Sequence, residues 1–194
     1  MDRICVYCGS SPGREPAYRT AAEDFGRMLA ARDLRLVYGG GHVGLMGTVA
    51  DATLDAGGAV HGVIPAALEE RELTHEGLTT LEVVDSMHAR KERMADLADG
   101  FVALPGGFGT LEELLEVLTW AQLGFHQKPC GVLNVADYFG DLAEFFDHQV
   151  EEGFVEPEHR EMLIVAEEAG ALLDAFAAHE PPEVKRFITD EDQT

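Results

Sequence analysis

Short apolar runs alternate with longer stretches of helical periodicity along most of the chain. The apolar runs, rich in valine, isoleucine and leucine, have the length of strands and span residues 3–7, 34–38, 59–64, 79–84, 100–104, 128–135 and 162–166. The periodic stretches predict helices near residues 16–32, 44–56, 87–98, 110–123 and 138–152, and a last helix that ends near residue 179. This alternation predicts an α/β fold, a doubly wound parallel sheet with helices on both faces, which binds ligands outside the carboxyl ends of its strands.

The chain is predicted to form one domain. Its 194 residues suit a single core, and no linker rich in glycine, serine or proline divides them. We expect the domain to cover residues 1–179, followed by a polar, acidic and mobile tail at residues 180–194.

The composition argues against several classes of partner. Hydrophobic residues make up 46% of the chain, but no apolar run approaches the roughly 20 residues that a membrane-spanning helix needs. The formal net charge of −22, from 36 acidic and 14 basic residues, would repel the phosphates of nucleic acids and of anionic lipids. The first residues lack the pattern of a signal peptide, so we expect a soluble cytoplasmic protein.

The cysteines and histidines do not predict a metal site. Cys5 and Cys8 form a single Cys-x-x-Cys pair, and Cys130 stands alone in an apolar run. A zinc site would need a second pair, or histidines at ligand spacing, and the sequence has neither. Reduced, structural cysteines are therefore the prediction.

The first glycine-rich loop, "VYGGGHVGLMG" at residues 37–47, follows a predicted strand and opens a predicted helix. Gly39, Gly41 and Gly44 match the G-x-G-x-x-G spacing of dinucleotide-binding folds. That function also needs an acidic residue about 20 positions further on to bind the ribose hydroxyls, and the next strand ends without one. The loop is therefore interpreted as a tight turn whose glycines also let a ligand approach the backbone.

The second glycine-rich loop, "LPGGFGTLEEL" at residues 104–114, admits two interpretations. Three glycines remove side chains just before a helix that we expect to start at Thr110. Because the unpaired N–H groups at a helix N-terminus attract anions, the loop predicts a phosphate site. Thr110 and Glu113 also match the capping box, in which both side chains cap the helix and the glycines only form a turn.

An arginine on the apolar face of the preceding predicted helix favours the phosphate site. Met87, Met94 and Leu97 share one face of that helix, and Arg90 falls between them. Because arginine is rarely buried without a partner, a carboxylate or a bound phosphate is implied. The alternative is a structural ion pair, for example with Glu72.

The other charged residues of this helix divide into two groups. Lys91 borders the face that carries Arg90 and is predicted to belong to the same anion site. Glu92, Arg93 and Asp96 point elsewhere and are expected to need only water.

Two motifs in this order are specific: an Arg-Lys in "MHARK" (87–91), followed by "PGGFGTLEE" (105–113). Together with "GSSPG" (9–13), "YGGGHVGLMG" (38–47), "RELTHE" (71–76) and "TWAQLGFHQKP" (119–129), they resemble the LOG family. Members of that family are cytokinin riboside 5′-monophosphate phosphoribohydrolases, often labelled lysine decarboxylases. The similarity extends from about Arg3 to Ala166.

The resemblance implies a Rossmann-like homodimer that cleaves the N-glycosidic bond of an adenine nucleotide, releasing free base and ribose 5-phosphate without a cofactor. It also implies Arg90 and Glu113 as the catalytic pair. The substrate contacts that it implies are Glu72, Arg90, Lys91, Gly107, Phe108, Gly109, Thr110, Leu111, Glu112, Glu113 and Thr119. A carboxylate such as Glu113 would stabilise the oxocarbenium-like ribose and position or deprotonate water.

Other functions fit these residues less well. A pyridoxal phosphate decarboxylase needs a Schiff-base lysine, and Lys91, Lys128 and Lys185 all occupy unsuitable positions in the pattern. A nucleotide-binding or molybdenum-cofactor-binding protein without hydrolysis is the alternative, but it would need the phosphate site and not the carboxylate. For protonation of the leaving base, His42 and His88 are candidates only by their proximity to the motifs.

Overall fold

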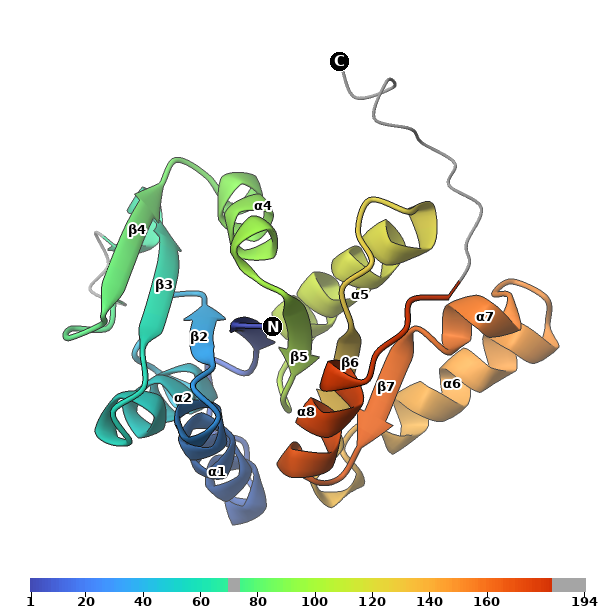
Figure 1. Cartoon of the computed structure of the whole chain (residues 1–194), viewed down its shortest axis with the longest axis horizontal. Coiled ribbons are helices and arrows are strands. Elements are labelled where there is room, and N and C mark those ends of the chain that lie inside the picture. The colour runs from blue at the N-terminus through green and yellow to red at the C-terminus, as the bar shows by residue number, and fades with distance from the viewer. Residues whose placement is uncertain (70–73, 183–194) are drawn as a thin grey trace.

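The computed structural model describes residues 1–69 and 74–182, and its centre is a sheet with the strand order β4-β3-β2-β1-β5-β6-β7 (Figure 1). The strands, each parallel to its neighbours, are β1 (Arg3–Tyr7), β2 (Arg35–Tyr38), β3 (Val60–Pro65), β4 (Thr80–Val84), β5 (Gly100–Ala103), β6 (Cys130–Leu133) and β7 (Leu163–Ala166). The helices are α1 (Pro16–Ala31), α2 (Gly44–Asp55), α3 (Ala66–Glu69), α4 (Met87–Leu97), α5 (Phe108–Leu123), α6 (Gly140–Glu151), α7 (Pro157–Arg160) and α8 (Ala169–Ala177), with a 3-10 turn η1 (Val135–Asp137). The predicted doubly wound α/β fold is confirmed.

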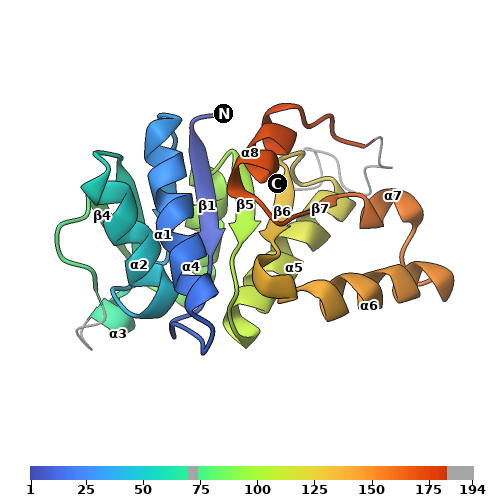
Figure 2. The same ribbon diagram turned by 90° about the horizontal axis from the view of Figure 1, so that it is seen from below.

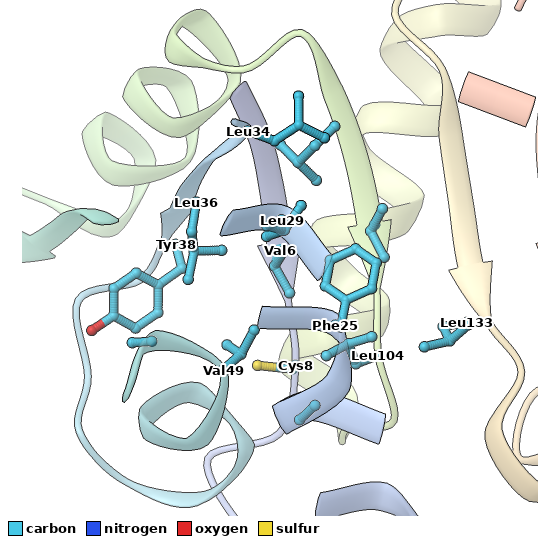
Figure 3. Close-up of a cluster of buried hydrophobic side chains, with 14 of the residues drawn as sticks. Val6, Cys8, Phe25, Leu29, Leu34, Leu36, Tyr38, Val49, Leu104 and Leu133 are labelled. Atoms are coloured by element: carbon cyan, nitrogen blue, oxygen red, sulfur yellow. The ribbon is translucent and has the colours of Figure 1, made fainter. Parts of the chain in front are cut away.

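Helices cover both faces of the sheet (Figures 1 and 2). Alternate residues of each strand face opposite sides of the sheet. Because both sides are covered by helices, the central strands are apolar at nearly every position. On one side α1, α2 and α8 share one core with Ile4 and Val6 of β1. Figure 3 shows Val6 of this core and the fully buried Phe25 of α1. On the other side α4 and α5 pack on Cys5 and Tyr7. Burial of a side chain such as Phe25 contributes about 1.5–3 kcal/mol, which fixes α1 against the sheet.

The chain changes direction across the sheet beside β1. It runs outward from β1 to β4 and then returns to form β5 on the other side of β1. The loops that leave β1 and β5 therefore diverge to opposite faces, which opens a crevice at the carboxyl ends of the two strands. A backbone hydrogen bond from the Gly9 N–H to the Pro105 carbonyl, at 3.0 Å, joins the two loops at their base.

The structure differs from the sequence prediction in several places. Helix α5 begins at Phe108, two residues before the predicted start at Thr110. Helices α3 and α7 were not predicted, because four residues are too few to show helical periodicity. Most of the predicted tail, residues 183–194, lies outside the described residues, as do residues 70–73. Within the described part of the chain, no helix combines the length and apolar character needed to cross a membrane.

Candidate active site

A cavity of about 380 Å³ lies at the carboxyl ends of β1 and β2, against the first turns of α4 and α5. This is the edge of the sheet at which the fold predicts a ligand. Its polar side chains are those of Ser10, Arg90, Thr110, Glu112 and Glu113. Its apolar side chains include those of Val43, Met46, Ile64, Leu68, Met87 and Met94. The cavity thus has a charged region and an apolar wall, as a site for an amphiphilic anion requires.

Arg90 and Glu113 form an ion pair inside this cavity. The Arg90 Nη2 donates to Glu113 Oε1 at 2.8 Å, and each residue is only 9% exposed. The pair joins α4 to α5. The expected carboxylate partner of the inward-facing arginine is therefore Glu113, whereas Glu72, the suggested alternative, lies outside the described residues.

Arg90 keeps hydrogen-bonding capacity beyond this pair. Its Nε is buried and has no partner among the described residues. An unpaired N–H of a buried guanidinium is costly, so the site favours a ligand that supplies an acceptor there.

The first glycine-rich loop makes room for this arginine. A Cβ at Gly39 would lie 2.6 Å from Arg90 Nη2 and 2.9 Å from its Cζ. Glycine directly after β2 thus lets the guanidinium lie against the backbone, and a larger residue would displace it from this position. The spacing of these glycines in the sequence predicts a tight turn open to a ligand, but it does not reveal which side chain approaches the backbone.

Burial governs the charge state of Glu113. Desolvation raises the pKa of this carboxyl above the usual 4.5, and the charge of Arg90 and its hydrogen bond oppose that rise. The same surroundings let Glu113 act as a carboxylate while making it a better proton acceptor than an exposed glutamate.

The N-terminus of α5 opens onto the cavity beside this pair. Gly107 is the N-cap residue and no side chain caps the helix, so the predicted capping box of Thr110 and Glu113 was wrong. The N–H groups of the first turn have no partner within the helix. Gly107 and Gly109 are exposed, Phe108 is 91% exposed, and Thr110 is buried below them. The sequence predicts an anion site at this terminus, which borders the cavity and has no side-chain cap.

Other residues that the resemblance implied lie further from the cavity. Lys91 is buried and bonded to two carboxylates, those of Glu112 and of Glu116, the latter at 3.0 Å. Leu111 packs half-buried against the core, and the exposed Thr119 lines a separate groove between α5 and α6. In the single chain, Thr119 is therefore not brought together with Arg90 and Glu113, whereas Lys91 borders the cavity through its bond to Glu112.

Four other charged or titratable residues that the sequence analysis considered lie outside the cavity. Arg93 donates two hydrogen bonds to Glu82 of β4, at 2.6 and 2.8 Å, so the expectation that it needs only water was wrong. His42 and His88 are exposed, and neither lines the cavity. Lys128 donates to the Ala95 carbonyl at 2.8 Å, outside the cavity.

The three cysteines are buried and unpaired. Burial raises the pKa of the Cys5 and Cys8 thiols well above their usual value, and that of Cys130 to about 12. Such thiols are protonated at neutral pH and are poor nucleophiles, even though Cys8 borders the cavity.

Known proteins resemble this chain over most of its length. The protein family described as "Possible lysine decarboxylase" matches residues 46–176. The cytokinin riboside 5′-monophosphate phosphoribohydrolase LOG3 of Arabidopsis thaliana is 51% identical over 92% of this chain and 83% of its own length. The probable cytokinin riboside 5′-monophosphate phosphoribohydrolase LOGL6 of Oryza sativa subsp. japonica is 50% identical over 92% of this chain and 72% of its own length.

Solved structures share the fold at lower identity. The Moco carrier protein of Chlamydomonas reinhardtii superimposes with a TM-score of 0.69 at 20% identity, covering 91% of this chain and 96% of its own. The molybdenum cofactor binding protein of Rippkaea orientalis gives 0.70 at 19% identity with the same coverage. At this level of identity, the two similarities show a shared fold and no more.

Proposed function

The chain belongs to the LOG family of cytokinin riboside 5′-monophosphate phosphoribohydrolases, and from this membership we propose that it hydrolyses the N-glycosidic bond of a purine nucleoside 5′-monophosphate. The products are the free base and ribose 5-phosphate. The observation that carries the proposal is the Arg90–Glu113 pair, which borders one cavity together with the free N-terminus of α5. Phosphate binding and glycosidic chemistry require these two features side by side.

The 5′-phosphate binds at the N-terminus of α5. The amides of residues 107–110 and the positive end of the helix dipole attract the dianion, and Arg90 supplies its Nε, which has no partner within residues 1–69 and 74–182. Because the phosphate does not react, its binding energy is available to hold the ribose in a strained geometry at C1′. The corresponding nucleoside lacks this anchor and is a poor substrate.

Glu113 acts on the ribose. As the bond between C1′ and the base nitrogen lengthens, positive charge develops on the sugar, and the buried carboxylate stabilises it. Glu113 then accepts a proton from the water whose oxygen attacks C1′ as the bond to the base nitrogen breaks. In net terms the OH of this water goes to C1′ and its proton to the departing base, which regenerates the Glu113 carboxylate. Arg90 orients the carboxylate through its hydrogen bond and offsets part of the cost of burying a negative charge.

The base lies against the apolar wall. Val43, Met46, Ile64 and Met87 offer a surface suited to a flat heterocycle and to an apolar substituent on it. The family name and this wall favour a cytokinin riboside monophosphate or AMP as substrate.

A non-hydrolytic carrier of a nucleotide or of molybdenum cofactor is the second candidate. The solved carrier proteins with this fold support it only at the level of the fold. A carrier needs the helix N-terminus but has no use for a buried carboxylate beside the sugar. The Arg90–Glu113 pair therefore favours the hydrolase.

We also infer that the active form is a homodimer. Helix α6 is amphipathic, yet none of its residues is buried, and Phe145 is exposed. The groove between α6 and α5 has a mixed lining, in which apolar side chains such as Leu115 and Phe146 alternate with polar ones that include Thr119. The resemblance implies that Thr119 contacts substrate, but Thr119 lies outside the cavity of its own chain. In a dimer formed through this groove, Thr119 of one copy would contact the substrate bound by the other copy. Light scattering should give twice the 21.1 kDa of one chain, and a mass of one chain would contradict the dimer.

The hydrolase is tested by incubating the protein with AMP and with isopentenyladenosine monophosphate and measuring the free base by chromatography. We expect base to be released from both monophosphates and not from adenosine. Binding of these nucleotides without release of base would favour the carrier instead.

A further inference from the structure

A tyrosine on the connection between β6 and α6 contacts the glycine loop of the site. The Tyr138 hydroxyl donates a hydrogen bond to the carbonyl oxygen of Gly106, which directly precedes the N-cap of α5. Tyr138 is not among the residues that line the cavity, so it reaches the loop from behind the site. A side chain in this position acts on a ligand only through the backbone that it holds.

We propose that Tyr138 is a positioning residue for the phosphate: by holding the Gly106 carbonyl, it keeps the Gly107 N–H directed into the cavity. The inference rests on the proposed function, because that function places a phosphate at this terminus. It assigns a role to a residue that neither the motifs nor the resemblance singled out.

The geometry of the peptide bond explains the effect. The Gly106 carbonyl and the Gly107 N–H belong to one planar trans peptide, so they point in opposite directions. Gly107 lines the cavity. A carbonyl held on the side of Tyr138 therefore leaves the N–H on the side of the ligand.

This peptide needs such a restraint. Glycine on both sides of it, at Gly106 and Gly107, removes the steric barriers that fix a peptide plane elsewhere in the chain. If the plane turned over, a carbonyl oxygen with its partial negative charge would face the phosphate in place of a donor. The hydrogen bond from Tyr138 opposes that change in the free protein, so the site is organised before the ligand arrives.

The ring of Tyr138 is fixed by its neighbours. It meets the ring of Tyr18 of α1 edge to face, with centroids 5.5 Å apart, and that of Phe139 at 5.0 Å. The buried Asn134 at the end of β6 accepts a hydrogen bond from the Phe139 N–H at 2.7 Å and donates one to Asp137 Oδ1 at 3.0 Å. These contacts hold the loop, and with it the Tyr138 hydroxyl, in one position.

The backbone of this loop supports a functional interpretation. Ala136 and Asp137 have φ angles of 49° and 57°, in the left-handed region that residues other than glycine rarely adopt. Two such residues in succession are costly and persist only where surrounding contacts enforce them. Here they lead the chain directly into Tyr138, which then reaches a carbonyl 32 positions earlier.

The test compares Tyr138→Phe with Tyr18→Phe. The first removes the hydroxyl that holds Gly106, and the second removes a hydroxyl from the other ring of the pair and leaves the Gly106 contact intact. Calorimetric titration with ribose 5-phosphate and with adenine separates the phosphate site from the base site. For Tyr138→Phe we expect the Kd for ribose 5-phosphate to rise roughly three- to tenfold, the worth of one hydrogen bond, with adenine binding unchanged. Tyr18→Phe should bind both ligands like the wild type.

Two results would overturn the inference: unchanged binding of ribose 5-phosphate by Tyr138→Phe, or an equal loss for adenine, which would indicate a general structural role. The proposed function is tested separately, by measurements on the wild-type protein. A wild type that binds ribose 5-phosphate but releases no adenine from AMP would contradict the hydrolase and leave the Tyr138 inference standing. A wild type that does not bind ribose 5-phosphate would contradict both.

Discussion

Arg90 of α4 and Glu113 of α5 meet at 2.8 Å on the wall of the cavity, although 23 positions separate them along the chain. Both are almost fully buried. Because a buried carboxylate is costly without a partner, the arginine allows Glu113 to remain charged beside the proposed ribose position. The pair therefore links the packing of two helices to the chemistry of the site.

Replacement of Glu113 by glutamine should abolish most of the hydrolysis. Loss of a general base and of its charge predicts a fall in kcat for AMP of roughly 10²- to 10⁴-fold. Affinity for ribose 5-phosphate should be retained, since the amides of α5 are unaffected. Glu116→Gln is the matched control, because Glu116 lies one turn further along the same helix and bonds to Lys91 outside the cavity. An unchanged rate for Glu113→Gln would refute the mechanism.

The pH dependence of hydrolysis should reflect the buried carboxylate. The pKa of Glu113 is raised above 4.5, and the reaction needs the ionised form. Activity should therefore fall as the pH decreases through a value above 4.5, because protonation there removes the base. Arg90→Ala removes the charge that opposes the rise, so its acidic limb should lie at higher pH, whereas that of Arg90→Lys should move less. A profile of kcat/KM against pH that has its acidic limb at or below 4.5 would contradict this assignment.

Two neighbouring glycines should respond differently to alanine. At Gly106 an added Cβ would lie 2.0 Å from Thr110 Oγ1 and 2.9 Å from the Gly9 N, whereas at Gly107 it would meet nothing within 4 Å. We expect Gly106→Ala to lose about 1–3 kcal/mol of unfolding free energy through overpacking. Gly107→Ala should unfold like the wild type but bind ribose 5-phosphate more weakly, because its methyl group occupies the approach to the amides. Urea unfolding and calorimetry check the two expectations, and equal stability of the two variants would contradict the first.

The Glu82–Arg93 pair should stabilise the fold in a pH-dependent way. Hydrogen bonds and the charge of Arg93 lower the pKa of Glu82 below 4.5, so the ionised form is favoured in the folded state. Because both side chains are partly exposed, we expect Glu82→Gln to cost only about 0.5–1 kcal/mol at pH 7. A depressed pKa gives stability that is present above the usual 4.5 and is lost as the pH falls through the lower, folded value.

The difference between the wild type and Glu82→Gln should therefore be full at pH 7 and disappear in strong acid. Glu92→Gln, an exposed neighbour of Arg93 on α4, is the control and should match the wild type in urea unfolding at both pH values. A cost of Glu82→Gln that did not change with pH would show that the ion pair is not its source.

The sequence by itself determined the fold class and pointed to the edge of the sheet that carries the candidate site. Strand-length apolar runs between helical stretches predict a parallel sheet, because only strands buried on both faces are apolar throughout. The glycines that follow β2 and precede α5 indicated where backbone approaches a ligand, and Arg90 on an apolar face indicated a buried anion. Each of these patterns is formed by residues that are close together in the sequence, so it can be recognised without knowing which distant segments come into contact.

Only the tertiary structure decided how these parts are joined. The capping box at Thr110 and Glu113 satisfies the local pattern, but the helix begins earlier, with Gly107 as its N-cap, and packing brings Glu113 to the buried Arg90. The approach of the Arg90 guanidinium to Gly39 and the hydrogen bond from Tyr138 to Gly106 also join segments that are distant in sequence. Such pairings have no periodicity along the chain, because the order of the strands in the sheet, and not their order in the sequence, determines which loops meet.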